Sequence, residues 1–242
     1  PAAPKGPETS IDQPGGLVKA LLAPVRWIFG GFAKDNLVEW VRVILIALAI
    51  ALPIRWALTE PYKIPSGSME PTLHGDPGFL QGDRVFVNKW RYGLRVPFIN
   101  ERIWRGEKPQ RWDIVVFRSV EPDSPNKILV KRIVGLPGER IQVGNGAVYA
   151  DGERLELAPG MPDVRYTREG FYGVLEDEEH SLVPPGHYLL LGDNSPQSRD
   201  GRYFGWVPND NLLGPVYAIW WPPPRWRDFT GFTDTWWWWT LV

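Results

Sequence analysis

Hydrophobic residues are rare at the start of the chain and then become frequent in two steps. Residues 1–16 carry almost no side chain that could be buried, so we expect a disordered lead-in. Residues 17–33 are apolar but are interrupted by Lys19, Pro24 and Arg26. This second pattern is compatible with a short helix lying in a membrane interface, with a soluble packing helix, or with a plain linker.

The strongest hydrophobic run extends from Leu37 to Leu58. Its uninterrupted apolar core, Val43 to Ile54, has 12 residues, a length that taken alone favours a buried helix or the core of an export signal. The flanks favour a membrane span, because Arg42 and Arg55 can extend their side chains to the two interfaces and a tryptophan stands just outside each of them. We therefore predict one transmembrane helix over residues 37–58, with a cleaved export signal as the alternative.

Basic residues are more frequent before this run than directly after it. Five precede its apolar core and two follow closely: Lys5, Lys19, Arg26, Lys34 and Arg42, then Arg55 and Lys63. Positively charged flanks stay on the cytoplasmic side of a membrane. The sequence thus predicts a single-pass protein, with residues 1–36 in the cytoplasm and residues 59–242 outside.

From residue 79 onward the pattern changes to short runs rich in valine, leucine and aromatic residues. These runs are "DRVFVNKW", "DIVVF", "HYLLLGD" and "GPVYAIWW". The stretch "ERIQVGNGAVYADGERL" contains Asn145-Gly146 and Asp151-Gly152, each flanked by residues suited to strands. Asn-Gly and Asp-Gly are the preferred pairs of two-residue hairpin turns, so this stretch predicts two successive hairpins.

Residues 153–185 interrupt the strand pattern. They are charged and marked by proline and glycine, which indicates a loop-rich insertion or a small subdomain. No long helix is predicted after residue 58, and 25 glycines and 25 prolines suit many short strands joined by turns. We predict a mostly β fold: an antiparallel β-sheet catalytic domain with Greek-key or barrel-like closure, preceded by one N-terminal transmembrane helix.

Composition and charge exclude several classes of function. The formal net charge of −1 offers no basic field for nucleic acid. The absence of cysteine excludes a disulfide framework, thiol catalysis and cysteine metal sites. The acidic residues do not follow a calcium-loop spacing, so we expect no metal and no cofactor.

The C-terminal tail contains four successive tryptophans, Trp236 to Trp239. Amphipathic indole rings suit the headgroup zone of a bilayer, so docking of the domain to lipid is one interpretation. Packing against the chain's own β core and a tail without function are the others.

The stretch "KIPSGSMEPTL", directly after the hydrophobic run, provides a candidate nucleophile. Ser68 lies between Pro65 and Pro71, which restrict the backbone, and beside Gly67, which permits close approach of another chain. A hydroxyl held rigidly at such a turn can be presented to a carbonyl group without a large entropic cost. The plain alternative is an ordinary turn next to a strand.

A nucleophilic serine needs a base, and the sequence disfavours histidine. The three histidines are His74, His180 and His187, and no "GxSxG" motif is present. A lysine can serve if burial lowers its pKa from the usual value of about 10.4. Lys131, within the apolar run "ILVKRIVG", is the candidate, although an ordinary edge-strand lysine explains the pattern equally well. The dense polar loop in "LLLGDNSPQSRDGRYFGW" could orient such a lysine.

Together these segments resemble the bacterial type I signal peptidases, or leader peptidases. The resemblance extends from Val43 to Pro215 and includes five motifs in the family's order: "PSGSMEPTL", "GDRVFVNKWRYG", "DIVVF", "KRIVGLPGERI" and "GDNSPQSRDGRYFGWVP". Members of this family are membrane-bound serine endopeptidases. They use a Ser–Lys dyad to remove N-terminal signal peptides from exported proteins, cutting after small residues in an A-x-A pattern.

The resemblance implies a role for each matching residue. Ser68 would be the nucleophile and Lys131 the general base, and the Ser66 hydroxyl and the Ser68 backbone N–H would hold the oxyanion. Ser198 would hydrogen-bond and orient the lysine. The supporting ion pair would be formed by Asp200 and Arg202.

The substrate pockets implied by the resemblance would be lined by Ile64, Met69, Leu73 and Leu129. Two positions depart from the family pattern. Trp112 stands where many members have glycine, and Leu129 where some have tyrosine. These departures concern the shape of the pocket more than the dyad.

The partners implied are the signal peptides of exported preproteins and the lipid bilayer of the bacterial inner (plasma) membrane; the sequence does not indicate an oligomeric state. Two alternatives remain. One is a dedicated processing peptidase of the same Ser–Lys class, and the other is an inactive membrane-anchored β-domain that binds exported chains. A self-cleaving repressor is disfavoured, because no DNA-binding domain is recognisable.

Overall fold

The computed structural model describes most of the chain from residue 37 to residue 226. The described residues are 37–57, 59–93, 102–104, 106–124, 127–226, 228 and 232. The predictions for residues 1–36 and for Trp236–Trp239 lie outside this part. The chain divides into two compact units, Pro1–Pro53 and Ile54–Val242, which we describe separately.

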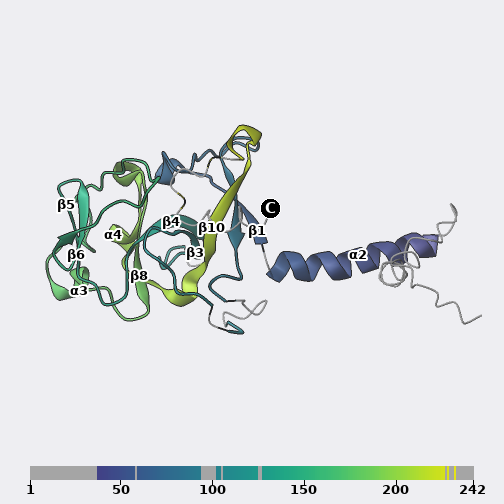
Figure 1. The fold of residues 1–242 in the computed structure, drawn as a ribbon, viewed down its shortest axis with the longest axis horizontal. Helices are drawn as coiled ribbons and strands as arrows, with labels where there is room; N and C mark the ends of the chain where they lie inside the picture. Colours follow the sequence, from purple (N-terminus) through teal and green to yellow (C-terminus); the bar gives the residue numbers. More distant parts are fainter. Residues whose placement is uncertain are drawn as a thin grey trace, which may run out of the picture. The chain divides into compact units, whose positions relative to one another are not determined.

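The helix α2 occupies Leu37–Ala57, within the range 37–58 for which a transmembrane helix was predicted (Figure 1). Its described apolar side chains are largely exposed: Trp40, Val41, Ile44, Leu45, Leu48, Ile50 and Leu52. Within the described part of the chain, no helix combines the length and apolarity needed to cross a membrane. The membrane span stays a prediction.

The second unit is mostly β, as the sequence predicts. Seven strands form a curled antiparallel sheet in the order β1-β2-β10-β3-β4-β8-β9 (Figure 1). Their bounds are β1 Thr59–Lys63, β2 Arg84–Asn88, β3 Ile114–Arg118, β4 Ile128–Gly135, β8 His187–Leu191, β9 Val207–Pro208 and β10 Leu212–Trp221. Register shifts in β10 and in the β4–β8 pairing mark irregularities of the kind that bend a sheet. Among the described strands β1 and β9 have only one neighbour each, so the sheet is a half-barrel and the predicted closure is incomplete.

A smaller sheet contains the two predicted hairpins. It consists of β5 (Ile141–Gly144), β6 (Ala147–Ala150) and β7 (Glu153–Arg154), and lies at the end of this unit away from β1 (Figure 1). Both turns have positive φ at their two central residues: 52° and 76° in the first, 51° and 85° in the second. Positive φ at both positions is the signature of the turn that Asn-Gly and Asp-Gly favour, so local sequence set these hairpins.

Residues 153–185 contain only β7 and the four-residue helix α3 (Glu178–Ser181) as regular elements. Val164, Tyr166 and Val183 from this stretch are buried in one cluster with residues of β5, β6 and β8. The stretch is therefore loop-rich and shares a core with the strands around it.

The remaining regular elements are single turns that follow strands. They are η1 (Gly67–Met69), η2 (Ser195–Gln197), α4 (Gly201–Phe204), η3 (Asn209–Asn211) and η4 (Pro223–Arg225). The first two carry polar residues of the candidate site, and both contact each other across the chain.

Candidate active site

Ser68 is held by the short turn η1 between β1 and β2. Met69 and Leu73 are 1% and 0% exposed and fix the turn to the core, while Ser68 itself stays partly exposed. The backbone N–H of Leu73 donates to the carbonyl of Met69 at 2.9 Å, which closes the next turn of chain. The apolar residues of this motif thus anchor the turn and leave its hydroxyl at the surface.

Lys131 comes from β4, where it pairs with Val115 of β3. Its side chain is only 3% exposed. The Nζ atom of Lys131 lies 2.5 Å from Oγ of Ser68 and donates a hydrogen bond to the carbonyl of Val130 at 3.1 Å. The structure therefore brings the two predicted dyad residues, 63 positions apart in sequence, into direct contact.

Burial lowers the pKa of Lys131 to about 8, against 10.5 for an ordinary lysine. The carboxylates of Asp200 and Asp193 act in the opposite direction, and the charge of Lys127 lowers the pKa further. Burial is the largest effect, because an ammonium group removed from water loses its solvation. The neutral amine, which can accept a proton, is thus far more populated near physiological pH than in an ordinary lysine.

Ser198 reaches the site without making the predicted hydrogen bond. It is 5% exposed, and its Oγ has no hydrogen-bond partner in the described part of the chain. A Cβ atom placed on Gly192 would lie 2.1 Å from that Oγ and 2.5 Å from the carbonyl oxygen of Ser68, so Ser198 packs close to the nucleophile turn. The amine of Lys131 bonds Ser68 and the Val130 carbonyl instead, which corrects the expected Ser198–Lys131 contact.

Ser66 begins the nucleophile turn and is exposed. Its side chain makes no capping hydrogen bond to η1. The backbone of Gly75 approaches it so closely that a Cβ atom there would lie 1.9 Å from the carbonyl carbon of Ser66. The hydroxyl is accessible to a ligand, and its role at an oxyanion stays a prediction.

The expected pair of Asp200 and Arg202 is present and is completely buried. Nε of Arg202 donates to Oδ1 of Asp200 at 2.9 Å, and both side chains are 0% exposed. Oδ2 of Asp200 also accepts the backbone N–H of Gly192 at 2.9 Å, and Arg202 donates to the carbonyl of Ser195 at 2.7 Å. The pair therefore fixes the loop that follows β8.

A second buried ion pair was not anticipated from the sequence. Arg132 donates to both carboxylate oxygens of Asp193, at 2.8 and 2.5 Å, and to the carbonyl of Trp112 at 2.8 Å. The hydroxyl of Thr72 donates to Asp193 at 2.5 Å. The sequence does contain a signal for this pair. Side chains alternate between the two faces of a strand, so a charged residue next to Lys131 points to the opposite face and needs its own partner there.

Asn194 also holds the nucleophile turn in place. Its backbone N–H donates to the carbonyl of Ser68 at 3.1 Å, and its side-chain amide donates to the carbonyl of Gly67 at 3.0 Å. The loop after β8 and η1 are thus joined by hydrogen bonds and close packing. Sequence spacing alone gave no sign of this contact.

The residues predicted to line the substrate pocket do not form one open pocket. Ile64, Met69 and Leu73 are at most 3% exposed and belong to a single core cluster. Leu129 packs against a different cluster, which contains Phe117 and other residues of the central strands. Ile64, Met69 and Leu73 lie in the core because burial of their apolar side chains stabilises the turn that carries Ser68.

Groups of three or more potential metal ligands from His, Cys, Asp and Glu are not found among the described residues. The reactive groups at this site are the Ser68 hydroxyl and the buried amine of Lys131, with the polar groups around them. Such an arrangement can carry out nucleophilic acyl transfer.

Residues 37–221 match the family described as signal peptidase, peptidase S26. The chain belongs to this family.

Among curated relatives, the signal peptidase I of Pseudomonas fluorescens is 34% identical over 228 residues, covering 81% of this chain and 78% of that protein. A probable signal peptidase I-1 of Synechocystis is 31% identical over 211 residues, with coverage of 84% and 89%. A crystal structure of a signal peptidase I from Enterococcus faecalis V583 is 36% identical and covers 45% of this chain and 97% of its own, with a TM-score of 0.37. The chain is thus a serine peptidase of the signal peptidase family.

Proposed function

We propose that this signal peptidase family member cleaves signal peptides from exported proteins through Ser68 and Lys131. The observation that carries the assignment is the 2.5 Å contact between Nζ of Lys131 and Oγ of Ser68, made by an amine that is 3% exposed. A neutral amine at hydrogen-bonding distance from a hydroxyl is the geometry that a general base requires.

In the proposed mechanism the neutral amine takes the proton of the Ser68 hydroxyl while its oxygen attacks the scissile carbonyl. The tetrahedral intermediate then collapses, and the ammonium of Lys131 returns the proton to the departing amine of the mature protein. A water molecule, deprotonated by the same lysine, attacks the acyl-enzyme and releases the signal peptide as a carboxylate. The ammonium of Lys131 then protonates the departing Ser68 oxygen, which regenerates Ser68 and neutral Lys131, and the product acid loses its proton to solvent.

The oxyanion of the intermediate needs donors. We assign this role to the Ser66 hydroxyl and the backbone N–H of Ser68, which belong to the same turn. Support comes from the exposed position of Ser66 and from the absence of a capping bond that would occupy its hydroxyl. Loss of one such donor typically lowers kcat by about 10²–10³.

In this proposal Asp200 and Arg202 act indirectly, through the residues that they hold in place. Their buried pair holds the backbone of Gly192, which in turn packs against Ser68 and Ser198. Ser198 is part of the same close packing, next to Gly192 and 5% exposed.

The substrate is proposed to be cut after small residues in an A-x-A pattern. Ile64, Met69 and Leu73 are close-packed in the core at the nucleophile turn. A bulky substrate side chain would have to displace these residues to bind there. Displacement of close-packed side chains is costly, which favours alanine-sized groups.

We further propose that α2 is the membrane tether of a single-pass protein with its N-terminus in the cytoplasm. Support comes from the exposed apolar side chains of α2 and from the excess of basic residues before it. Ser68 lies 11 positions after the end of α2 at Ala57, and an extended chain of this length spans at most roughly 40 Å. The nucleophile would therefore stay near the membrane surface, where the cleavage sites of signal peptides emerge.

The decisive experiment measures cleavage of a precursor peptide with an A-x-A site by the full chain in detergent. Ser68→Ala and Lys131→Met should each abolish detectable turnover, and loss of the base alone should cost at least about 10²–10⁴ in rate. Lys108→Met, at an exposed lysine, is the matched control and should cleave like the wild type. Near wild-type turnover by a folded Lys131→Met variant would refute the dyad.

A further inference from the structure

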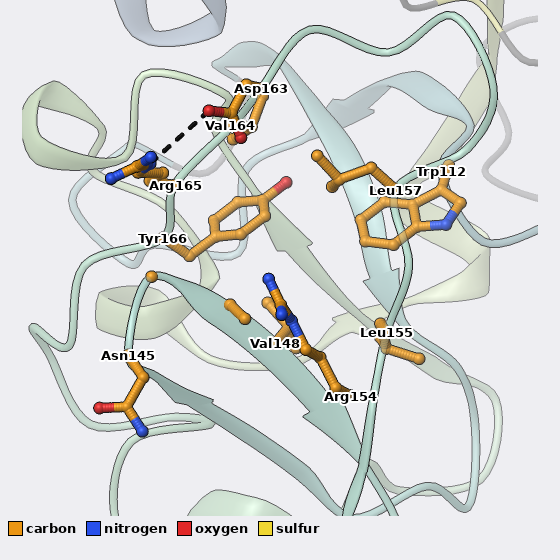
Figure 2. Close-up of a pocket in the computed structure, with 12 residues that line it drawn as sticks. Trp112, Asn145, Val148, Arg154, Leu155, Leu157, Asp163, Val164, Arg165 and Tyr166 are labelled. Atoms are coloured by element: carbon orange, nitrogen blue, oxygen red, sulfur yellow. Dashed lines mark ion pairs between the residues drawn. The ribbon is translucent and has the colours of Figure 1, made fainter.

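A cavity of about 390 Å³ lies between the small sheet and Trp112, which precedes β3, and neither dyad residue lines it (Figure 2). Its apolar wall includes Trp112, Val148, Leu155 and Leu157. Binding sites for small molecules are typically cavities of this size with an apolar lining and a few convergent polar groups.

One polar group in this cavity has no partner. Tyr166 is 2% exposed, and its hydroxyl makes no hydrogen bond in the described part of the chain. The backbone N–H of Tyr166 donates to the carbonyl of Gly146 at 3.2 Å, which holds the backbone of Tyr166 beside the β5–β6 turn. Figure 2 shows the hydroxyl directed into the space before Leu157 and Trp112. An unpaired buried hydroxyl costs free energy, so its retention favours an external partner.

A positive charge faces the same space. The guanidinium of Arg154, from β7, points toward the ring of Tyr166 in Figure 2. Within the described part of the chain no carboxylate pairs with Arg154, whereas Arg165 at the rim of the cavity pairs with Asp163 at 3.6 Å. Arg154 is therefore the charge that remains available to a ligand.

The aromatic wall is held in an unusual backbone conformation. Trp112 has φ of 73°, a region that non-glycine residues rarely adopt, and its side chain is 7% exposed. Two hydrogen bonds of 2.8 Å keep it there: its N–H donates to the carbonyl of Ile133, and its carbonyl accepts from Arg132. Backbone strain that surrounding structure maintains in this way tends to occur at functional sites.

We propose that this cavity binds a small amphipathic carboxylate. The fork of the Arg154 guanidinium matches the two oxygens of a carboxylate, the Tyr166 hydroxyl donates a further hydrogen bond, and the apolar body of the ligand packs against Trp112 and the neighbouring leucines. Burial raises the pKa of Tyr166, so its phenol stays protonated and remains a donor.

The test titrates 3-phenylpropionate into the full chain in detergent and measures binding by calorimetry. Saturable binding is expected, and it should weaken at least about tenfold in Arg154→Gln, which removes a charge-assisted bond. Tyr166→Phe removes one neutral donor and should weaken binding about three- to tenfold. This variant should fold like the wild type, because the hydroxyl has no bond to lose.

Three controls separate this cavity from other sites. The uncharged analogue 3-phenylpropanol should bind at least about tenfold more weakly than the acid. Arg165→Gln, at the paired arginine of the rim, and Ser68→Ala, at the dyad, should each bind the acid within about twofold of the wild type. An absence of saturable binding would overturn the proposal, as would equal losses in Arg165→Gln and Arg154→Gln or unchanged binding in Tyr166→Phe.

Discussion

At the scale of single residues, the proposed activity depends on the amine of Lys131, which is buried away from water. Lys131 has only the Ser68 hydroxyl and the Val130 carbonyl as hydrogen-bond partners, and no carboxylate contacts its Nζ in the described part of the chain. Two buried carboxylates are near enough to raise its pKa, yet both are bonded to arginines. Burial therefore dominates, and the lysine can act as a base at a pH where free lysine is fully protonated.

This balance predicts the pH dependence of activity. Because only neutral Lys131 accepts the proton of Ser68, kcat/KM should rise with pH, with an apparent pKa of about 8, and then level off. Lys127→Gln removes a positive charge that lowers the pKa of Lys131, so it should move the midpoint to higher pH. Rate profiles of both proteins on one peptide provide the measurement, and a midpoint near 10 in the wild type would mean that the amine is solvated.

At the scale of elements, the end of β8 positions the nucleophile turn. Gly192 packs against the carbonyl of Ser68, and Asn194 donates to the carbonyls of Ser68 and Gly67. The buried Asp200 holds the backbone N–H of Gly192 in turn. The turn η1 has too few residues to define its own position, so contacts from β8 define it.

Gly192→Ala tests this contact. The added Cβ would lie 2.1 Å from Oγ of Ser198 and 2.5 Å from the carbonyl oxygen of Ser68, so the nucleophile turn must move. A displacement near 1 Å can lower the rate about 10²-fold. We expect a fall of that size in kcat/KM, measured on the peptide well below the melting temperature of the variant.

Gly144→Ala serves as the matched control, since a Cβ atom at Gly144 would meet nothing within 4 Å. It should retain wild-type kcat/KM. Equal activity of the two alanine variants would show that β8 and the turn do not touch.

At the scale of the whole molecule, a buried network joins three segments far apart in sequence. Arg132 from β4 pairs with Asp193 after β8, and Asp193 accepts the hydroxyl of Thr72 from the chain after η1. Arg132 and Asp193 have side chains that are 0% exposed. The network ties the central strands to the segment that carries the nucleophile.

Removing one charge from this network should be strongly destabilising. Asp193→Asn leaves the guanidinium of Arg132 buried without its counter-charge, and we expect the free energy of unfolding to fall by about 3–5 kcal/mol. Urea denaturation monitored by circular dichroism gives the value. Glu121→Gln breaks the more exposed pair with Arg199 and should cost less than about 1 kcal/mol. The hypothesis fails if the two variants lose similar stability.

The proposed tether makes a prediction about substrates. A fragment beginning at Thr59 retains every described strand, so it should cleave a soluble A-x-A peptide within about tenfold of the full chain. Without α2 it loses the local concentration that attachment to one membrane provides, so cleavage of a precursor inserted in vesicles should fall by about 10² or more. Equal cleavage of the inserted precursor by fragment and full chain would contradict the tether.

The sequence by itself determined the features that depend on neighbouring residues. Asn145-Gly146 and Asp151-Gly152 impose positive φ, so both hairpins followed from local conformational preference. The helix at residues 37–57 and the alternation of buried residues in β2 followed from hydrophobic pattern. Motif order also indicated Ser68 and Lys131, because residue types at matching positions are visible without coordinates.

Only the tertiary structure decided how distant residues meet. It placed Lys131 against Ser68, left the hydroxyl of Ser198 without the expected bond, and packed the predicted pocket residue Leu129 against a core cluster other than that of Ile64, Met69 and Leu73. It also paired Arg132 with Asp193, 61 positions later. These outcomes depend on strand register, close packing and the cost of burying charge, which are properties of the assembled sheet and of no single stretch of sequence.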